Sequence, residues 1–198
     1  MVPTVVAPRT TVSNSASSTK SLCSTSPSTT LTHPSQLAPW IPNKTFESFL
    51  PKIDEVVAYF KSEHGVTKFG AMGYCMGAWI VAKYSATRGN VLSAGISFHP
   101  SWVFEHLFHG EGSGVKIAEQ ITVPQLILTA GNDVEWIKPG GDVDKILASR
   151  GVPSVLREFP DVLHGWVIRG DLSDPVIAEA YRAAWDDEAL PFLKKFLA

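Results

Sequence analysis

The segment FGAMGYCMGAW at residues 69–79 sets the expectations for the rest of the chain. Its first half is short, apolar and interrupted by glycine, which is typical of a buried strand, and residues 78–84 continue at helical length without a breaker. A strand that turns directly into a helix needs small residues at the corner, and Gly73 and Gly77 flank Cys75 there. The spacing predicts a nucleophile elbow, a sharp turn that lifts the Cys75 side chain clear of the sheet.

Cys75 would lie at the N-terminus of the predicted helix. The unpaired amides and the helix dipole at that end favour an anion, so they lower the pKa of a thiol and make a nucleophilic thiolate available. The alternative is an ordinary buried cysteine, because free cysteines are among the most buried residues and behave as small hydrophobes. Residues 73–77 alone do not distinguish these two interpretations, so the evidence has to come from residues elsewhere in the sequence.

Composition limits the class of protein. The 198 residues are 44% hydrophobic and 18% charged, which is sufficient for one globular domain with its own core. A net charge of -2 predicts no binding to nucleic acid or to an anionic membrane, and no apolar run is long enough to span a bilayer. The two cysteines have different surroundings, which favours a reducing compartment. We therefore expect a cytoplasmic protein that binds small molecules and needs no cofactor or metal.

Residues 1–38 differ in composition from the rest, because serine, threonine and proline dominate and Arg9 and Lys20 are the only charged side chains. We expect this low-complexity segment to be disordered, with residues 4–7 as the only fragment that could form a brief strand. A transit peptide, and therefore an organellar location, is an alternative, and so is a wrongly joined gene fragment. Cys23 and His33 fall in this segment and receive no role.

Residues 39–198 form the predicted domain. Apolar positions between 46 and 60 recur at helical spacing, Pro51 suggests an interruption or a second start near Asp54, and Gly65 marks the end of the helix. Further strands are predicted at 91–98, 123–130 and 155–159, and further helices at 142–149 and over most of 175–198. This alternation predicts an α/β fold with a mostly parallel sheet, helices on both faces and functional groups at the carboxyl ends of the strands.

Three candidate reactive groups follow predicted strands. Cys75, Asp133 and His164 occur in the order nucleophile, acid and base, which is the order of α/β-hydrolases. Cys75 would attack a carbonyl carbon, His164 would take and return the proton, and Asp133 would orient the imidazole. Glu135 is an alternative acid, but the turn directly after the strand favours Asp133.

The chain resembles the dienelactone hydrolase family, whose members carry cysteine at the elbow where most α/β-hydrolases carry serine. The matching motifs are GYCMG at 73–77, GND at 131–133 and HGW at 164–166, with Arg169 shortly after, and the resemblance covers about residues 40–198. It implies a hydrolase of a small ester or lactone that uses Cys75, Asp133 and His164 through an acyl-thioester intermediate.

The resemblance also implies substrate contacts. In the family an arginine near the histidine can hold a substrate carboxylate, and Arg169 matches this position loosely; its alternative role is an ordinary surface ion pair. Trp166, next to the base, and Tyr74 are candidate pocket residues, whereas Trp79, Trp102 and Trp136 are expected in the core or the pocket wall. A metal site formed by His99, His106 and His109 fits no established ligand spacing, so these histidines are read as structural.

The chain departs from the family before the elbow, because the early strands have no counterpart and the domain is expected to be incomplete at its N-terminus. The Met76 N–H group would remain as one oxyanion donor without its partner, and loss of one donor typically costs about 100-fold to 1000-fold in rate. The elbow strand would expose an edge, which predicts self-association. The rival hypothesis is an inactive homologue that acts as a binding module. A serine-type peptidase or lipase is disfavoured by the cysteine.

Overall fold

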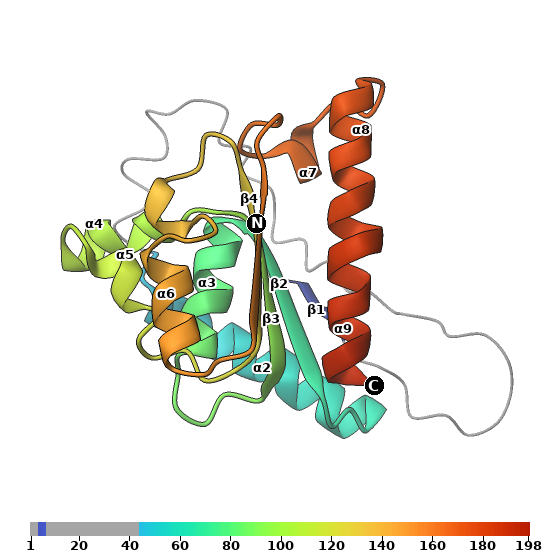
Figure 1. Ribbon diagram of the computed structural model, residues 1–198. Coiled ribbons are helices and arrows are strands. Elements are labelled where there is room, and N and C mark those ends of the chain that lie inside the picture. The colour runs from blue at the N-terminus through green and yellow to red at the C-terminus, as the bar shows by residue number, and fades with distance from the viewer. Residues whose placement is uncertain (1–3, 7–43) are drawn as a thin grey trace, which may run out of the picture.

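The computed structural model describes residues 4–6 and 44–198, and the remainder of the segment 1–38, with Cys23 and His33, lies outside the described residues. The centre of the fold is a five-stranded sheet (Figure 1). Its strands lie in chain order: β1 (Thr4–Val6), β2 (Phe69–Cys75), β3 (Leu92–Pro100), β4 (Gln125–Ala130) and β5 (Ser154–Phe159). β1 is antiparallel to β2 and the other pairs are parallel, which confirms a mostly parallel α/β sheet.

Helices cover both faces of this sheet and enclose two hydrophobic cores (Figure 1). One face carries α2 (Phe46–His64), α3 (Met76–Ser85) and α6 (Asp142–Ser149). The other carries α8 (Pro175–Arg182), the π-helical segment η4 (Ala183–Ala189) and α9 (Leu190–Leu197), which follow one another without a break. No helix within 4–6 and 44–198 has the length and apolar character needed to cross a membrane.

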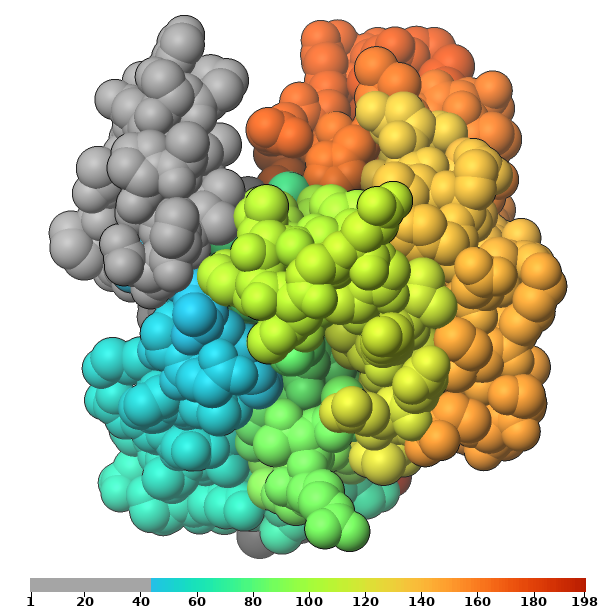
Figure 2. Space-filling view, turned by 90° about the vertical axis from the view of Figure 1, so that its left-hand side faces the viewer, coloured from blue at the N-terminus to red at the C-terminus, as the bar shows by residue number. Residues whose placement is uncertain are grey.

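Short helical segments connect the strands near the carboxyl end of the sheet. They are η2 (Trp102–Glu105), α4 (His106–His109), α5 (Ser113–Lys116), η3 (Glu135–Ile137) and α7 (Trp166–Arg169). Figure 2 shows the yellow-green segment that carries α4 and α5 at the centre of one face, between α2 in cyan and α6 in orange. Glu105 anchors this segment to α3, because its buried carboxylate accepts hydrogen bonds from Trp79 Nε1 at 2.7 Å and Lys83 Nζ at 2.6 Å.

Two expectations about elements need correction. The helix α2 runs without interruption through Pro51, because its apolar face packs Phe46, Val57 and Phe60 into one core along its whole length. β3 continues to Pro100 and does not end before His99, because a register shift lets Pro100 pair with Cys75. The end of α2 is as predicted, since Gly65 caps it with a left-handed φ of 61°.

The sheet edge next to the elbow strand also differs from the expectation. β1 pairs with β2 so that Val5 lies opposite Ala71, with neighbouring pairs on both sides. The prediction of an uncovered elbow-strand edge is therefore wrong over residues 70–72, because the short strand that the sequence allowed at 4–7 satisfies that part of the backbone.

Candidate active site

The elbow forms at the junction of β2 and α3. Cys75 has a φ of 53°, an uncommon value for a residue other than glycine, and α3 begins at the next residue, Met76. A Cβ atom at Gly73 would lie 2.2 Å from the carbonyl oxygen of Gly77, so only glycine fits there. A Cβ atom at Gly77 would meet nothing within 4 Å. The tight corner thus depends on Gly73, and the expectation that Gly77 also has to make room is wrong.

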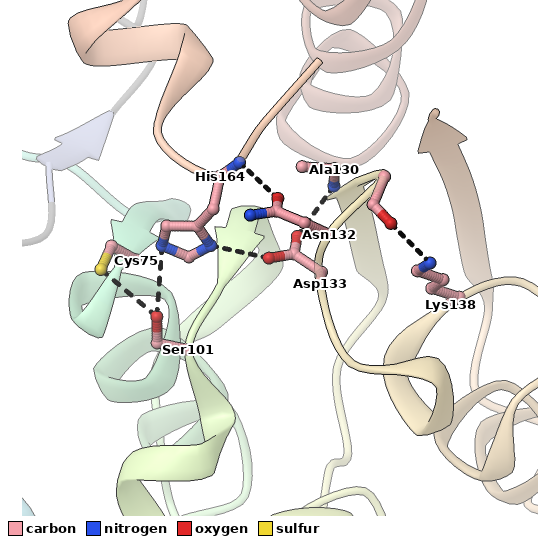
Figure 3. Close-up of polar contacts among 8 residues, drawn as sticks. Cys75, Ser101, Ala130, Asn132, Asp133, Lys138 and His164 are labelled. Carbon is pink, nitrogen blue, oxygen red and sulfur yellow. Dashed lines mark hydrogen bonds and ion pairs between the residues drawn. The ribbon is translucent and has the colours of Figure 1, made fainter. Parts of the chain in front are cut away.

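The turn after β4 presents Asp133. Its Oδ2 atom accepts a hydrogen bond from the Ala130 N–H at 2.8 Å, which fixes the carboxylate against the end of the strand. Lys138 Nζ donates to the Gly131 carbonyl oxygen at 2.9 Å (Figure 3). It also pairs with Glu158 at 3.0 Å, so it ties this turn to β5. The Asp133 side chain is only 4% exposed.

His164 lies in the loop after β5 and meets this turn twice. Its Nδ1 atom is 2.6 Å from Asp133 Oδ1, and its backbone N–H donates to Asn132 Oδ1 at 2.6 Å (Figure 3). Glu135 points elsewhere, because its 87% exposed side chain forms an ion pair with Lys138. Of the two acids weighed from the sequence, Asp133 is the one in contact with His164.

A residue that the sequence analysis missed, Ser101, joins these groups. Its Oγ atom is 3.3 Å from Cys75 Sγ and 3.4 Å from His164 Nε2, so the hydroxyl lies between them (Figure 3). Ser101 follows β3 and is separated by 26 residues from Cys75 and by 63 from His164. The only local signal was that it follows His99-Pro100 at the end of a buried strand.

The electrostatics of the pair favour a thiolate and an imidazolium. Burial opposes ionisation of Cys75, but hydrogen bonds from His164 and Ser101, the charge of His164 and the Met76 N–H lower the pKa of the thiol below its ordinary value. The hydrogen bond to Asp133, followed by that to the Cys75 thiolate, raises the pKa of His164 to about 9, against the effect of burial. Each group thus stabilises the charged form of the other.

The three other candidate histidines do not converge. His99 is fully buried, with its ring centroid 4.8 Å from that of His164, and burial followed by the charge of His164 lowers its pKa to about 4. His106 packs against Trp136, and His109 is 3.5 Å from Glu105. Among residues 4–6 and 44–198, no cluster of three potential metal ligands occurs.

A cavity of about 410 Å³ opens beside His164. Its lining includes His164, Trp166 and Arg169. Arg169 is exposed, lies over Gly165 and forms no ion pair within the described part of the chain, so the guanidinium is available to an anion. Tyr74 lies apart from the cavity lining, stacked on Phe98 with ring centroids 5.0 Å apart.

The mostly parallel sheet and the helices on its two faces define an α/β-hydrolase fold. The acylaminoacyl peptidase of Pyrococcus horikoshii has a similar structure, with a TM-score of 0.53 and 16% sequence identity over 77% of this chain and 27% of the peptidase. A complex of acylaminoacyl peptidase with the chloromethyl ketone of Z-Gly-Gly-Phe superimposes with a TM-score of 0.55 at 17% identity, over 77% of this chain and 27% of that chain.

Sequence comparison identifies the family within this fold class. Residues 34–197 match the dienelactone hydrolase family, and the chain belongs to it. It is 26% identical to the hydrolase tropI of Talaromyces stipitatus, over 70% of this chain and 50% of the relative. It is 32% identical to dienlactone hydrolase 1 of Gibberella moniliformis, over 56% of this chain and 39% of the relative. The chain thus spans half or less of the length of these relatives, whose names support a hydrolase.

Proposed function

We propose that this protein hydrolyses a small ester or lactone through a covalent acyl-thioester on Cys75, with His164 as the base and Asp133 as the residue that orients it. The observation that carries the proposal is the convergence of the three groups at the carboxyl ends of β2, β4 and β5. A nucleophile on a strained elbow faces an imidazole whose Nδ1 atom is held 2.6 Å from a buried carboxylate.

The first half of the reaction forms the thioester. The Cys75 thiolate adds to the carbonyl carbon, and the oxygen of the tetrahedral intermediate takes the negative charge within reach of the Met76 N–H at the start of α3. As the bond to the alcohol oxygen breaks, His164 Nε2 gives its proton to the leaving alkoxide. In a lactone the alcohol stays attached to the acyl group.

The second half releases the acid. The now neutral His164 accepts a proton from water, and the resulting hydroxide adds to the thioester carbonyl. The carbon–sulfur bond then breaks and regenerates the thiolate beside the imidazolium. The raised pKa of His164, about 9, favours this resting ion pair at neutral pH.

The cavity beside His164 supports a preference for substrates that carry a carboxylate. Arg169 offers a guanidinium at its wall without a competing carboxylate partner in the described residues, and Trp166 offers a buried aromatic surface. We therefore assign Arg169 and Trp166 to substrate binding. Tyr74, packed on Phe98, would act at most by shaping the elbow strand beneath them.

Hydrolysis of an aryl acetate tests the proposal. Turnover is expected for the wild-type protein and loss of about 1000-fold or more for Cys75→Ala and His164→Ala. Glu135→Gln is a matched control, because it removes an acidic side chain from the same loop without touching His164. Turnover that survives both active-site substitutions would exclude the mechanism. A folded protein without turnover, judged by circular dichroism, would favour an inactive binding homologue.

A further inference from the structure

Two adjacent strand ends are strained at the site. Among the described residues, Cys75 and His99 are the only residues other than glycine with a positive φ, 53° and 36° respectively. Cys75 ends β2, and His99 is the second-last residue of the neighbouring strand β3. The sheet register shifts here, because Tyr74 pairs with Phe98 but Cys75 pairs with Pro100, which leaves His99 without a partner on β2. Strained residues and bulges of this kind re-aim the chain that follows them.

The residue that this bulge redirects is Ser101, two positions after His99. Its backbone N–H donates to the Cys75 carbonyl oxygen at 3.1 Å, which places the residue directly against the elbow. Its hydroxyl then lies 3.3 Å from Cys75 Sγ and 3.4 Å from His164 Nε2, and the residue is only 8% exposed. Ser101 also precedes η2, but its side chain makes no capping hydrogen bond there. The position of the hydroxyl is therefore explained by the site and not by the helix.

A hydroxyl group suits this position because it can donate one hydrogen bond and accept others. When the pair is neutral, the thiol can donate to Ser101 Oγ and the hydroxyl to His164 Nε2. When the pair is ionised, the imidazolium donates to Ser101 Oγ and the hydroxyl to the thiolate. The second arrangement contains two charge-assisted hydrogen bonds, which are stronger than neutral ones, so the hydroxyl shifts the balance towards the ion pair.

We propose that Ser101 is a further catalytic residue, whose hydroxyl bridges Cys75 and His164 and holds them as a thiolate–imidazolium pair before substrate binds. The proposal rests on the function proposed above, since it deepens the roles of the same two groups. The hydrogen bond from Ser101 is also among the causes that lower the pKa of the Cys75 thiol.

The other titratable groups near Cys75 and His164 do not mask the effect of Ser101 on the ionisation of Cys75. Asp133 contacts His164 from the β4 turn and stays fixed by the Ala130 N–H, and His99 faces His164 from β3. Because the pKa of His99 is lowered to about 4, its ring is neutral near neutral pH. The pKa of Tyr74 is raised to about 12, so its phenol is neutral there as well. The titration of Cys75 is therefore coupled chiefly to His164.

The rate of alkylation by iodoacetamide as a function of pH tests the proposal without any substrate. In a Cys23→Ser background, Cys75 is the only thiol, because the sequence has two cysteines. Ser101→Ala is expected to move the midpoint of the alkylation profile to higher pH and to lower kcat/KM for an aryl acetate about 10-fold to 100-fold, the effect of losing a hydrogen bond to a charged group. Ser101→Thr, which keeps the hydroxyl, is expected to restore the low midpoint.

The possible outcomes separate this proposal from the preceding one. A Ser101→Ala profile that coincides with the wild-type profile, while His164→Ala shifts it, would overturn the role of Ser101 and leave the mechanism intact. A shifted Ser101→Ala profile in a protein without ester turnover would support the role of Ser101 while the proposed hydrolase function fails. If Ser101→Ala does not fold, Ser101→Gly removes the same hydroxyl at a position that precedes η2, where glycine is tolerated.

Discussion

At the scale of single residues, the site is a chain of groups that act on one another. Asp133 raises the pKa of His164, and His164 lowers the pKa of Cys75. Ser101 contacts the two groups at the end of this chain. The resting charge state therefore depends on all of these groups together. A substitution at Asp133 is expected to change the pKa of Cys75, although the two side chains do not touch each other.

The pH dependence of kcat/KM follows from these shifts. In the proposed mechanism the active form has a thiolate and an imidazolium, so activity should rise as Cys75 ionises below its ordinary pKa and fall as His164 loses its proton near pH 9. The Asp133 carboxylate stabilises the protonated imidazole, so Asp133→Asn should move the falling limb to lower pH. It should also reduce kcat by roughly 1000-fold or more.

Glu135→Gln is the control for that measurement and should leave both limbs in place, because Glu135 pairs with Lys138 on the surface side of the turn. A falling limb that moves with Glu135→Gln and not with Asp133→Asn would exchange the roles of the two acids.

At the scale of elements, Glu105 links the elbow helix α3 to the segment that carries Ser101. Its buried carboxylate accepts from Trp79 Nε1 and from Lys83 Nζ, both on α3, while Glu105 itself belongs to η2 just after Ser101. The Lys83 side chain is 20% exposed and that of Glu105 6%, so water cannot readily replace either partner. This contact therefore joins α3 and η2, the two elements that adjoin Cys75 and Ser101.

Glu105→Gln is expected to lower the free energy of unfolding by about 2 kcal/mol, because the amide nitrogen must face one of the two donors and the Lys83 charge loses its partner. Urea denaturation measures the effect. Glu55→Gln is the matched control, since Glu55 pairs with Lys52 on an exposed helix surface with side chains 68% and 80% exposed. That change should cost less than about 0.5 kcal/mol. Equal effects of the two substitutions would show that the Glu105 contact does not stabilise the fold.

At the scale of the whole molecule, the sheet places the site and β1 covers part of the strand that carries it. The parallel strands β2 to β4 bring Cys75, Ser101 and Asp133 to the carboxyl end of the sheet. The helices α8 and α9 cover the sheet face opposite to α2, α3 and α6 (Figure 1). β1 pairs with residues 70–72 of β2 and satisfies the backbone there. Without that pairing, an apolar strand with unpaired amides would be open to a second molecule.

Replacing both Val5 and Val6 by proline tests this role of β1. Successive residues of a strand direct their N–H groups to opposite sides, so one of the two prolines removes a donor from the β1–β2 ladder. We expect concentration-dependent association of the variant in sedimentation velocity experiments, at protein concentrations where the wild type shows less. Identical sedimentation of the two proteins over the whole concentration range would show that β1 does not protect this edge.

The sequence by itself determined the elements and the order of the reactive groups. The apolar runs and glycines predicted β2 and α3 within two residues of their observed bounds, and the helix at 142–149 was predicted at its observed bounds. These signals are local, because periodicity and turn chemistry act over a few residues. The continuous course of α2 through Pro51 was not predicted, because packing of its apolar face outweighs a local breaker.

Only the tertiary structure decided which groups meet. The sequence placed Asp133 and Glu135 two residues apart, and the β4 turn directs one to His164 and the other to Lys138. Its only sign of Ser101 was the strand end at His99-Pro100, which does not reveal that the hydroxyl reaches Cys75, because that position depends on the register shift between β2 and β3. Register is set by the packing of whole strands, and a shift of one residue redirects every side chain that follows. The elbow could therefore be predicted from residues 69–79, but the hydroxyl beside its thiol could not.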